Sequence, residues 1–597
     1  MRRRELLATP ATLLAPLGAS AAAGQGVLRY ALPAAETGFD PALISDIYSS
    51  AIVAHIVEGL YGYDHLARPP RLKCVTAAAM PEVSADFRVW TVRVKPGIYF
   101  DEDPAFKGRK RELTAEDYLY SIKRVADPKV GSPLWSDLEV SGIKGLAEVR
   151  KALRTSGASF DYDRPIEGLR TLDRYTLRIE LERPLPAFVN LLARGSSFGA
   201  VAREVIEAYP GRSMEHPVGT GPYRLKEWRR SSFMALERNP GHRERFYRDE
   251  VQPAADDAEG QAWLRQFGDR RLPMVDRVEV SIVEEEQPRW LAFLNGEFNF
   301  IERVAAAYQR SAMPHGHLAP GLAKAGLHGY RMQASDVVYS IFNMEDPVVG
   351  GYTPDKVALR RAIGLATDVR GDIRLVRNGN AVPSQSVFVP NTSGYDPARR
   401  TEMGEQDPAR AKALLDLFGY IDRDGDGWRE LPDGKPLVLE ARTSPGDLYR
   451  QLDTVWQKGL AAVGLKVDFL PAPWGDNAKL ARAGNFQIWA QGETAESPDG
   501  LEALTKGLSS NIGGTNYARF SMPAYDALCR RISELPEGPE RSALLDQASR
   551  ILLAYMPYKC RGHRIITDMT GPGMQGYRRP PLWTNWWEYI SVEQDKA

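Results

Sequence analysis

Residues 218–228 read VGTGPYRLKEW, and ten residues further on the chain continues with the triplet Arg238-Asn239-Pro240. Gly219 and Gly221 flank a single threonine and precede Pro222. Glycine permits backbone paths and close approaches that a side chain would block, and proline fixes its own φ angle. We therefore predict a tight turn at which a bulky residue could not follow the path of the chain. This stretch directs the backbone, and we assign it a structural role.

Segments with strand periodicity and segments with helical periodicity alternate on both sides of this turn. Apolar residues at every second position predict half-buried strands around 90–94, 177–181, 278–282. Helical spacing predicts helices in 359–366 and in 452–463, and Asp407-Pro408 is typical of a helix start. No short internal repeat is visible. The mixture predicts α/β lobes with mixed sheets.

The length and charge of the chain limit the classes of protein to consider. With 597 residues, the chain has room for about three or four domains, or for two large lobes. A hydrophobic content of 43% and a charged content of 26% are ordinary for a globular protein. The 77 basic residues balance 77 acidic ones, so net charge gives no reason to expect nucleic acid as a partner.

The first 23 residues have the three parts of a secretory signal. Arg2, Arg3 and Arg4 precede a short apolar run, and small residues follow up to Ala23. The stretch from Arg3 to Leu7 is similar to a twin-arginine export signal, and an ordinary Sec signal is the alternative. No cysteine lies near the predicted cleavage site and no later stretch of about 18 apolar residues occurs. We therefore expect an exported, soluble periplasmic protein without a lipid anchor.

Two further features of the sequence suggest no particular function. Cys529 and Cys560 could pair, but all three cysteines, with Cys74, could equally be small buried hydrophobic residues. Residues 243–272 are rich in charge and poor in apolar periodicity, which predicts a surface insertion that is partly helical around Trp263.

Two motifs that carry chemistry elsewhere are weak here. Gly195-Ser196-Ser197-Phe198-Gly199 fits the nucleophile pattern G-x-S-x-G, but that pattern needs a preceding strand, and 188–193 looks helical. Asp422, Asp424 and Asp426 resemble a calcium loop, yet Asp433 stands where the bidentate glutamate belongs, so a tight turn explains them equally well. We predict no catalytic residue, no metal site and no cofactor.

Several passages occur in the same order as in the dipeptide/oligopeptide-binding family of transporter-associated solute receptors, the extracellular family 5, and resemble it. The stretch VGTGPYRLKEW at residues 218–228 is the most specific of these passages. The others are Phe39–Ala42 with Ile56–Leu60, Pro81–Phe100, Leu113–Arg124, Asn295–Glu297, Phe342-Asn343 with Leu359–Asp368, and Asn516–Phe520. Together they span nearly all of the chain after the signal segment.

The resemblance implies a two-lobed periplasmic-binding-protein fold of class II, cluster C, in the α/β class with mixed sheets and an extra subdomain in the first lobe. The expected parts are 24–60, the subdomain 61–216, and 217–332 for lobe I, 333–558 for lobe II, and 559–597 returning to lobe I. Crossings near Gln333 and Tyr558 would form the hinge between the lobes, which would close around a ligand.

The resemblance also suggests where a ligand would bind. In peptide-binding members an aspartate of lobe II pairs with the free amino terminus of the peptide. Gly492 stands at that position here, so either Glu493 takes over the amine or the ligand lacks a standard amino terminus. Trp489 would stack on the ligand, with a role in the core as the alternative. Further candidates at matching positions are Ser45, Asp46, Tyr48, Glu302, Arg303, Tyr339, Gln491, Thr515, Asn516 and Tyr517.

The function implied is that of the substrate-binding component of an ABC import system. It would be a monomer that binds a peptide or a peptide-like small solute between its lobes and delivers it to the permease subunits in the inner membrane. It would not be an enzyme, and it would bind no nucleic acid. The alternatives are a secreted serine hydrolase acting through Ser197 and a sensory receptor of the same fold.

Overall fold

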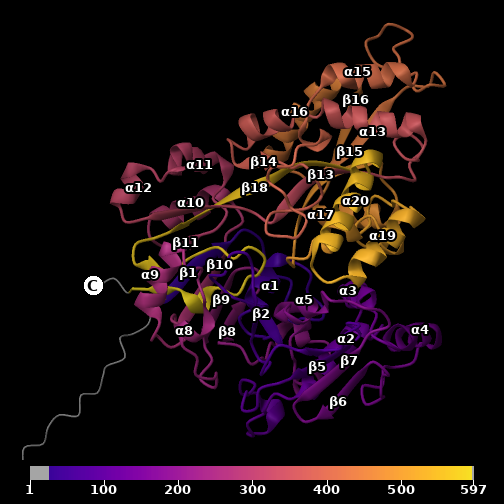
Figure 1. Ribbon diagram of the computed structural model, residues 1–597. Helices are drawn as coiled ribbons and strands as arrows, with labels where there is room; N and C mark the ends of the chain where they lie inside the picture. The colour runs from indigo at the N-terminus through magenta and orange to yellow at the C-terminus, as the bar shows by residue number, and fades with distance from the viewer. Residues whose placement is uncertain (1–25, 594–597) are drawn as a thin grey trace, which may run out of the picture.

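The computed structural model describes residues 26–593 in three bodies (Figure 1). The predicted signal segment, 1–23, lies outside the described residues. One body holds the sheet of the expected subdomain, a second holds the strands of lobe I, and the third, in orange and yellow, holds lobe II (Figure 1). Among the described helices, none is both long enough and apolar enough to cross a membrane.

The subdomain is a four-stranded antiparallel sheet covered by a helix. The strands in spatial order are β4 (Glu82–Val83), β5 (Val89–Arg93), β7 (Thr176–Glu180) and β6 (Leu169–Asp173). Alternate residues such as Trp90 and Leu177 are buried, as the period of two predicts. The helix, α2 (Ala115–Ala126), begins with a capping box formed by Thr114 and Asp117.

Lobe I is built around a parallel strand from the start of the chain. In spatial order its strands are β11 (Phe300–Ile301), β1 (Val27–Leu32), β10 (Arg277–Ile282), β9 (Phe233–Arg238) and β8 (Tyr223–Arg229). The turn before β8 explains why two glycines occur in the stretch VGTGPYRLKEW. A Cβ atom on Gly219 would lie 2.0 Å from the carbonyl oxygen of Ile56, and one on Gly221 would lie 2.6 Å from that of His55. Only glycine permits such a close approach of two backbone segments.

Lobe II packs helices on a second set of strands of the same continuous sheet. The strands in order are β16 (Lys466–Pro471), β15 (Val438–Thr443), β17 (Ile488–Thr494) and β13 (Asp336–Phe342). The helices are α13 (Pro354–Ala366), α15 (Pro408–Leu417), α16 (Asp447–Ala461), α17 (Trp474–Ala483), α18 (Leu501–Thr505), α19 (Pro523–Glu534) and α20 (Pro539–Tyr555). Asp407 caps α15 through the amide of Arg410, as expected from the sequence.

One long strand, β18 (Tyr558–Thr570), runs through both lobes (Figure 1). Its first half pairs with β13 and β14 (Ala381–Pro383), and its second half pairs with β12 (His328–Gln333) and β11. The change of partner falls between Arg564 and Ile565. The other crossing is the two-residue link between β12 and β13. Two neighbouring backbone connections therefore join the lobes.

The charged segment 243–272 is helical around Trp263, as predicted, and many of its residues are exposed, but it is more than a surface decoration because several of its side chains are buried. It forms α8 (Tyr247–Glu250) and α9 (Ala258–Phe267), and Tyr247 is fully buried. Apolar side chains of the segment form a small core with Leu66 and Tyr589. The charges do not prevent burial because they are partnered: Arg245, for example, forms a buried ion pair with Glu588.

The three cysteines are free thiols, and Cys529 and Cys560 are buried in lobe II. The two buried thiols pack among apolar side chains, which matches the alternative of small hydrophobic residues.

Candidate functional site: a cavity between the lobes

A cavity of about 280 Å³ lies where the lobes and the subdomain meet. Lobe I and its subdomain supply most of the wall, through α1 (Ile47–Val53), α6 (Gly195–Phe198) and the C-terminal segment 579–589. Lobe II supplies the end of β17 and the residues after it, Thr494–Glu496, and the hinge supplies Ala334 and Ser335. Enclosed sites between domains are a common location for small ligands.

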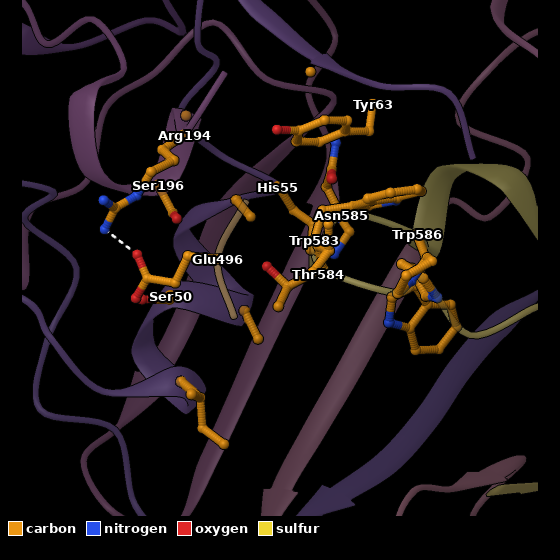
Figure 2. A pocket seen from close by; sticks show the side chains of 18 of the residues that line it. Ser50, His55, Tyr63, Arg194, Ser196, Glu496, Trp583, Thr584, Asn585 and Trp586 are labelled. Atoms are coloured by element: carbon orange, nitrogen blue, oxygen red, sulfur yellow. Dashed lines mark ion pairs between the residues drawn. The ribbon is translucent and has the colours of Figure 1, made fainter. Parts of the chain in front are cut away.

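An ion pair at the cavity joins the subdomain to lobe II. Arg194 in the subdomain pairs with Glu496 of lobe II (Figure 2). The other side of the Arg194 guanidinium binds Asp137 at 2.8 Å, within its own lobe. Burial alone would lower the pKa of Arg194, but the two carboxylates outweigh it and raise that pKa. The arginine therefore stays charged and joins the two bodies.

Stacked aromatic rings form a rigid wall on the lobe I side. Tyr63 stacks on Trp583 with 5.2 Å between the ring centroids, and His55 stacks on Trp587 at 3.7 Å. Figure 2 shows Trp583, from the C-terminal segment, near Tyr63. Burial lowers the pKa of His55 to about 3, so the imidazole is neutral at physiological pH. This wall offers flat apolar surface to a ligand.

The inner part of the wall carries charges that are already neutralised. The Lys73 ammonium donates to Glu250 at 2.5 Å and to the hydroxyl of Tyr589 at 2.8 Å. Arg245 pairs with Glu588 and lies 3.3 Å from Glu250. Because these charged groups are paired with one another, they hold the C-terminal segment against lobe I. They have little remaining capacity to form ion pairs with a ligand.

Five of the residues predicted to contact a ligand do line the cavity: Ser45, Asp46, Tyr48, Glu302 and Arg303. Asp46 has a structural task there. Its carboxylate accepts from the amide of Ser49 at 2.7 Å and from the hydroxyl of Thr37 at 2.6 Å, which caps α1. The Glu302 carboxylate lies 3.5 Å from Arg579, and the carboxylates of Glu302 and Asp568 partly offset the effect of burial on the Arg303 guanidinium.

The seven candidates from lobe II lie outside this cavity. Trp489 is fully buried in the core of lobe II, where Tyr517 packs edge-on against it at 5.2 Å. No face of the indole is therefore exposed for stacking on a ligand. Asn516 is also fully buried, and its amide nitrogen donates to the carbonyl oxygens of Leu508 and Phe520. Thr515 is exposed next to it.

Glu493, the nearest acid to the missing aspartate, is engaged inside lobe II. It accepts from the Lys506 ammonium at 2.9 Å and from the hydroxyl of Tyr339, which in turn accepts from Gln491 at 3.0 Å. Burial would raise the pKa of Glu493, but the Lys506 charge and the hydrogen bonds hold that pKa below its usual value. The Glu493 carboxylate is thus ionised, and the Lys506 ammonium already balances its charge.

Several residues of the wall could not be predicted from the sequence, above all Tyr63, Arg194, Glu496 and Trp583. They come from segments up to about 500 positions apart, so no local pattern joins them. In the aromatic segment 583–589, Trp586 and Trp587 both pack in the core of lobe I and line the cavity.

The G-x-S-x-G pattern lacks the geometry of a nucleophile elbow. Ser196 and Ser197 line the cavity, but they lie on α6, and the helix α5 (Phe188–Leu192) precedes them instead of a strand. The close approach of Gly195 to Gly59, where a Cβ atom would lie 2.7 Å from the amide nitrogen, explains the first glycine of the pattern.

Known proteins resemble the chain over nearly its whole length. Di/tripeptide-binding protein 2 of Pseudomonas aeruginosa is 26% identical over 98% of this chain and 98% of its own length. Heme-binding protein A of Haemophilus influenzae is 24% identical over 94% of this chain and 92% of its own. These relatives are binding proteins rather than enzymes.

Solved structures share the fold. The ABC transporter-associated periplasmic binding protein DppA from Helicobacter pylori, in complex with the peptide STSA, superposes with a TM-score of 0.72 at 20% identity, covering 95% of this chain and 98% of that one. The model of the bacterial extracellular solute-binding proteins, family 5 (middle), matches residues 72–515, well over half of the sequence. This protein therefore belongs to family 5 of the bacterial extracellular solute-binding proteins.

Proposed function

We propose that this protein is the periplasmic substrate-binding component of an ABC import system and that its ligand is a short peptide. The observation that carries the proposal is the cavity between two bodies joined by two backbone crossings. Closure of such bodies around a solute removes it from water, which strengthens each polar contact inside. The name of the Pseudomonas aeruginosa relative, a di/tripeptide-binding protein, supports the ligand class.

The size of the cavity favours a short ligand. Its volume of about 280 Å³ is just below the roughly 300–1,000 Å³ that small-molecule sites span. A dipeptide or tripeptide is of this size, whereas a long oligopeptide would need the lobes to stand further apart. We propose that Ser45, Tyr48, Glu302 and Arg303 contact the ligand, together with the stacked pair Tyr63 and Trp583.

Isothermal titration calorimetry on the purified protein tests this function. A panel of dipeptides, tripeptides and hexapeptides should give saturable binding for the short members and weaker binding for the hexapeptides. Native mass spectrometry of protein isolated from its own periplasm should show a short peptide bound, recovered chemically unchanged. Turnover of the bound compound, or saturable binding of other solutes but of no peptide, would refute the proposal.

A further inference from the structure

The contact between the subdomain and lobe II gathers several carboxylates around one guanidinium. Arg194 of the subdomain pairs with Asp137 of its own body and with Glu496 of lobe II (Figure 2). Glu502, near the start of α18, is a third carboxylate whose charge acts on Arg194. Three carboxylates facing one guanidinium leave an excess of negative charge in a partly buried place. Binding of a proton relieves such an excess.

Hydrogen bonds within lobe II hold Glu502 beside Glu496. The Glu502 carboxylate accepts from the amides of Glu496 and Ser497, each at 2.9 Å, and from the hydroxyl of Ser497 at 2.9 Å. All of these groups belong to one short segment of the chain. The two acids of lobe II therefore stay together whether the lobes are apart or in contact, and only their neighbours from the other lobe change.

The other charged groups that lobe II places around Glu502 are already paired. Asp499 binds Arg541 at 2.6 Å. Lys506 and Glu493 line a small cavity together with Glu502, and these two bind each other at 2.9 Å. Each of these two cations thus has a carboxylate of its own, and neither one is left to neutralise Glu502.

The lobe I side covers Glu502 with one phenol and one shared cation. The pKa of Tyr63 is raised by its burial and by the charges of Glu502 and Asp499, so these acids lie close to its hydroxyl. Burial, followed by the charge of Glu496, raises the pKa of Glu502 to about 7, and the hydrogen bonds and the Arg194 charge oppose this shift only in part. When the lobes separate, water replaces Tyr63 and Arg194, and the carboxyl returns toward the ordinary glutamate pKa of about 4.3.

We propose that closure of the lobes takes up a proton at Glu502, so that solute binding is linked to the acidity of the compartment. The proposal rests on the closure in the proposed function and adds its regulation. A carboxyl that binds its proton more tightly in the closed form stabilises that form when protonated. The gain is complete below about pH 4, where both forms are protonated. It is lost as the pH rises through 7.

Calorimetry with alanyl-alanine compares the wild type with Glu502→Gln, which cannot ionise at this position. In buffers of different ionisation enthalpy at pH 7, the wild type should take up about half a proton more per bound peptide, since a group at its pKa is half protonated. From pH 5.5 to pH 7.5 its affinity should fall at least about tenfold more than that of the variant.

Other titrating groups cancel in this comparison. The amino terminus of the peptide is the same in both measurements. His55 lines the cavity, but its pKa of about 3 keeps it neutral over the whole range. Asp372, whose pKa is about 6, is buried within lobe II and keeps its neighbours when the lobes move. The difference between the two proteins therefore reports on Glu502.

Two further variants separate this effect from damage to the fold. Ser497→Ala leaves Glu502 in place and removes a hydroxyl that favours the ionised carboxylate, so the midpoint of the pH dependence should move upward. Glu440→Gln makes the same change as Glu502→Gln at an exposed position of lobe II, and it should keep the wild-type pH dependence and proton uptake.

The outcomes distinguish this proposal from the broader one. If the wild type and Glu502→Gln take up equal numbers of protons and share one pH dependence, proton-linked closure is refuted while peptide binding stands. If no peptide binds at any pH, the proposed function fails, and small-angle scattering of the ligand-free protein then tests closure alone. The radius of gyration should rise between pH 5.5 and pH 7.5 for the wild type and stay constant for Glu502→Gln. A constant radius for both would overturn the proposal.

Discussion

The role of Trp489 depends on its surroundings, which the sequence does not show. Family resemblance suggested an aromatic platform for the ligand, whereas the structure buries the indole completely among the side chains of lobe II. We expect Trp489→Ala to lower the free energy of unfolding of the ligand-free protein by about 3–5 kcal/mol, the usual cost of emptying a large buried site. Urea denaturation followed by circular dichroism measures this change.

A neighbouring tryptophan gives the control. Trp474 is 52% exposed and packs against Trp489 at 6.2 Å between centroids, so Trp474→Ala should cost less than about 1 kcal/mol. Equal and small losses for the two variants would mean that Trp489 is not a core residue.

Family resemblance named Glu302 and Arg303, which line the cavity, but it named neither the ion pair of Arg194 with Glu496 nor the stacked rings. Glu302 and Arg303 were found because a turn of the resembling family precedes them. The stack of Tyr63 on Trp583 joins residues 520 positions apart, and each residue alone has ordinary apolar neighbours. Hydrophobic pattern encodes burial, and it does not encode which distant ring will lie opposite.

At the scale of elements, periodicity predicted strands and helices where their own residues bury one face. β5, β7, β10, α13 and α16 all lie at the expected places. The buried part of the segment 243–272 was not predicted, because its burial depends on ion pairs with distant residues, among them Glu58 and Glu588. Charge density predicts exposure only when the partners are also near in sequence, and these partners are 185 and 343 positions away.

Strand β18 meets α16 and the short helix 372–376 at a buried charge cluster that should make stability depend on pH. Arg561 lies 3.7 Å from Asp372, and burial raises the pKa of Asp372 to about 6. A carboxyl whose pKa is raised by folding stabilises the fold most when it is protonated. Its contribution is therefore complete below about pH 4, the value of the unfolded chain, and is lost as the pH rises through 6.

The variant Asp372→Asn isolates this contribution because asparagine cannot ionise. We expect the unfolding free energy of the variant, relative to the wild type, to rise between pH 4.5 and pH 7 and then to level off. Chemical denaturation at a series of pH values measures the difference. A difference that is independent of pH would show that Asp372 keeps an ordinary pKa in the folded protein.

At the scale of the whole molecule, the lobes are joined at the hinge by backbone and at the cavity by the ion pair of Arg194 with Glu496. These two connections have different energetic consequences. The strand β18 and the link between β12 and β13 persist in any arrangement of the lobes, because they are covalent. The ion pair exists only when the lobes are close, so its free energy adds directly to the equilibrium between open and closed forms.

Removing this ion pair should therefore weaken binding without altering any ligand contact. If Glu496→Gln lowers the closed population of the free protein about tenfold, the apparent affinity for a peptide falls by the same factor, since only the closed form is competent to bind. Small-angle scattering should show a larger radius of gyration for the ligand-free variant, and calorimetry should show the loss of affinity. Asp137→Asn is the matched control, because it takes from Arg194 the partner within its own lobe and leaves the contact between lobes intact. If Asp137→Asn weakens binding as much as Glu496→Gln does, the arginine acts by its own positioning, and the contact between the lobes contributes nothing to closure.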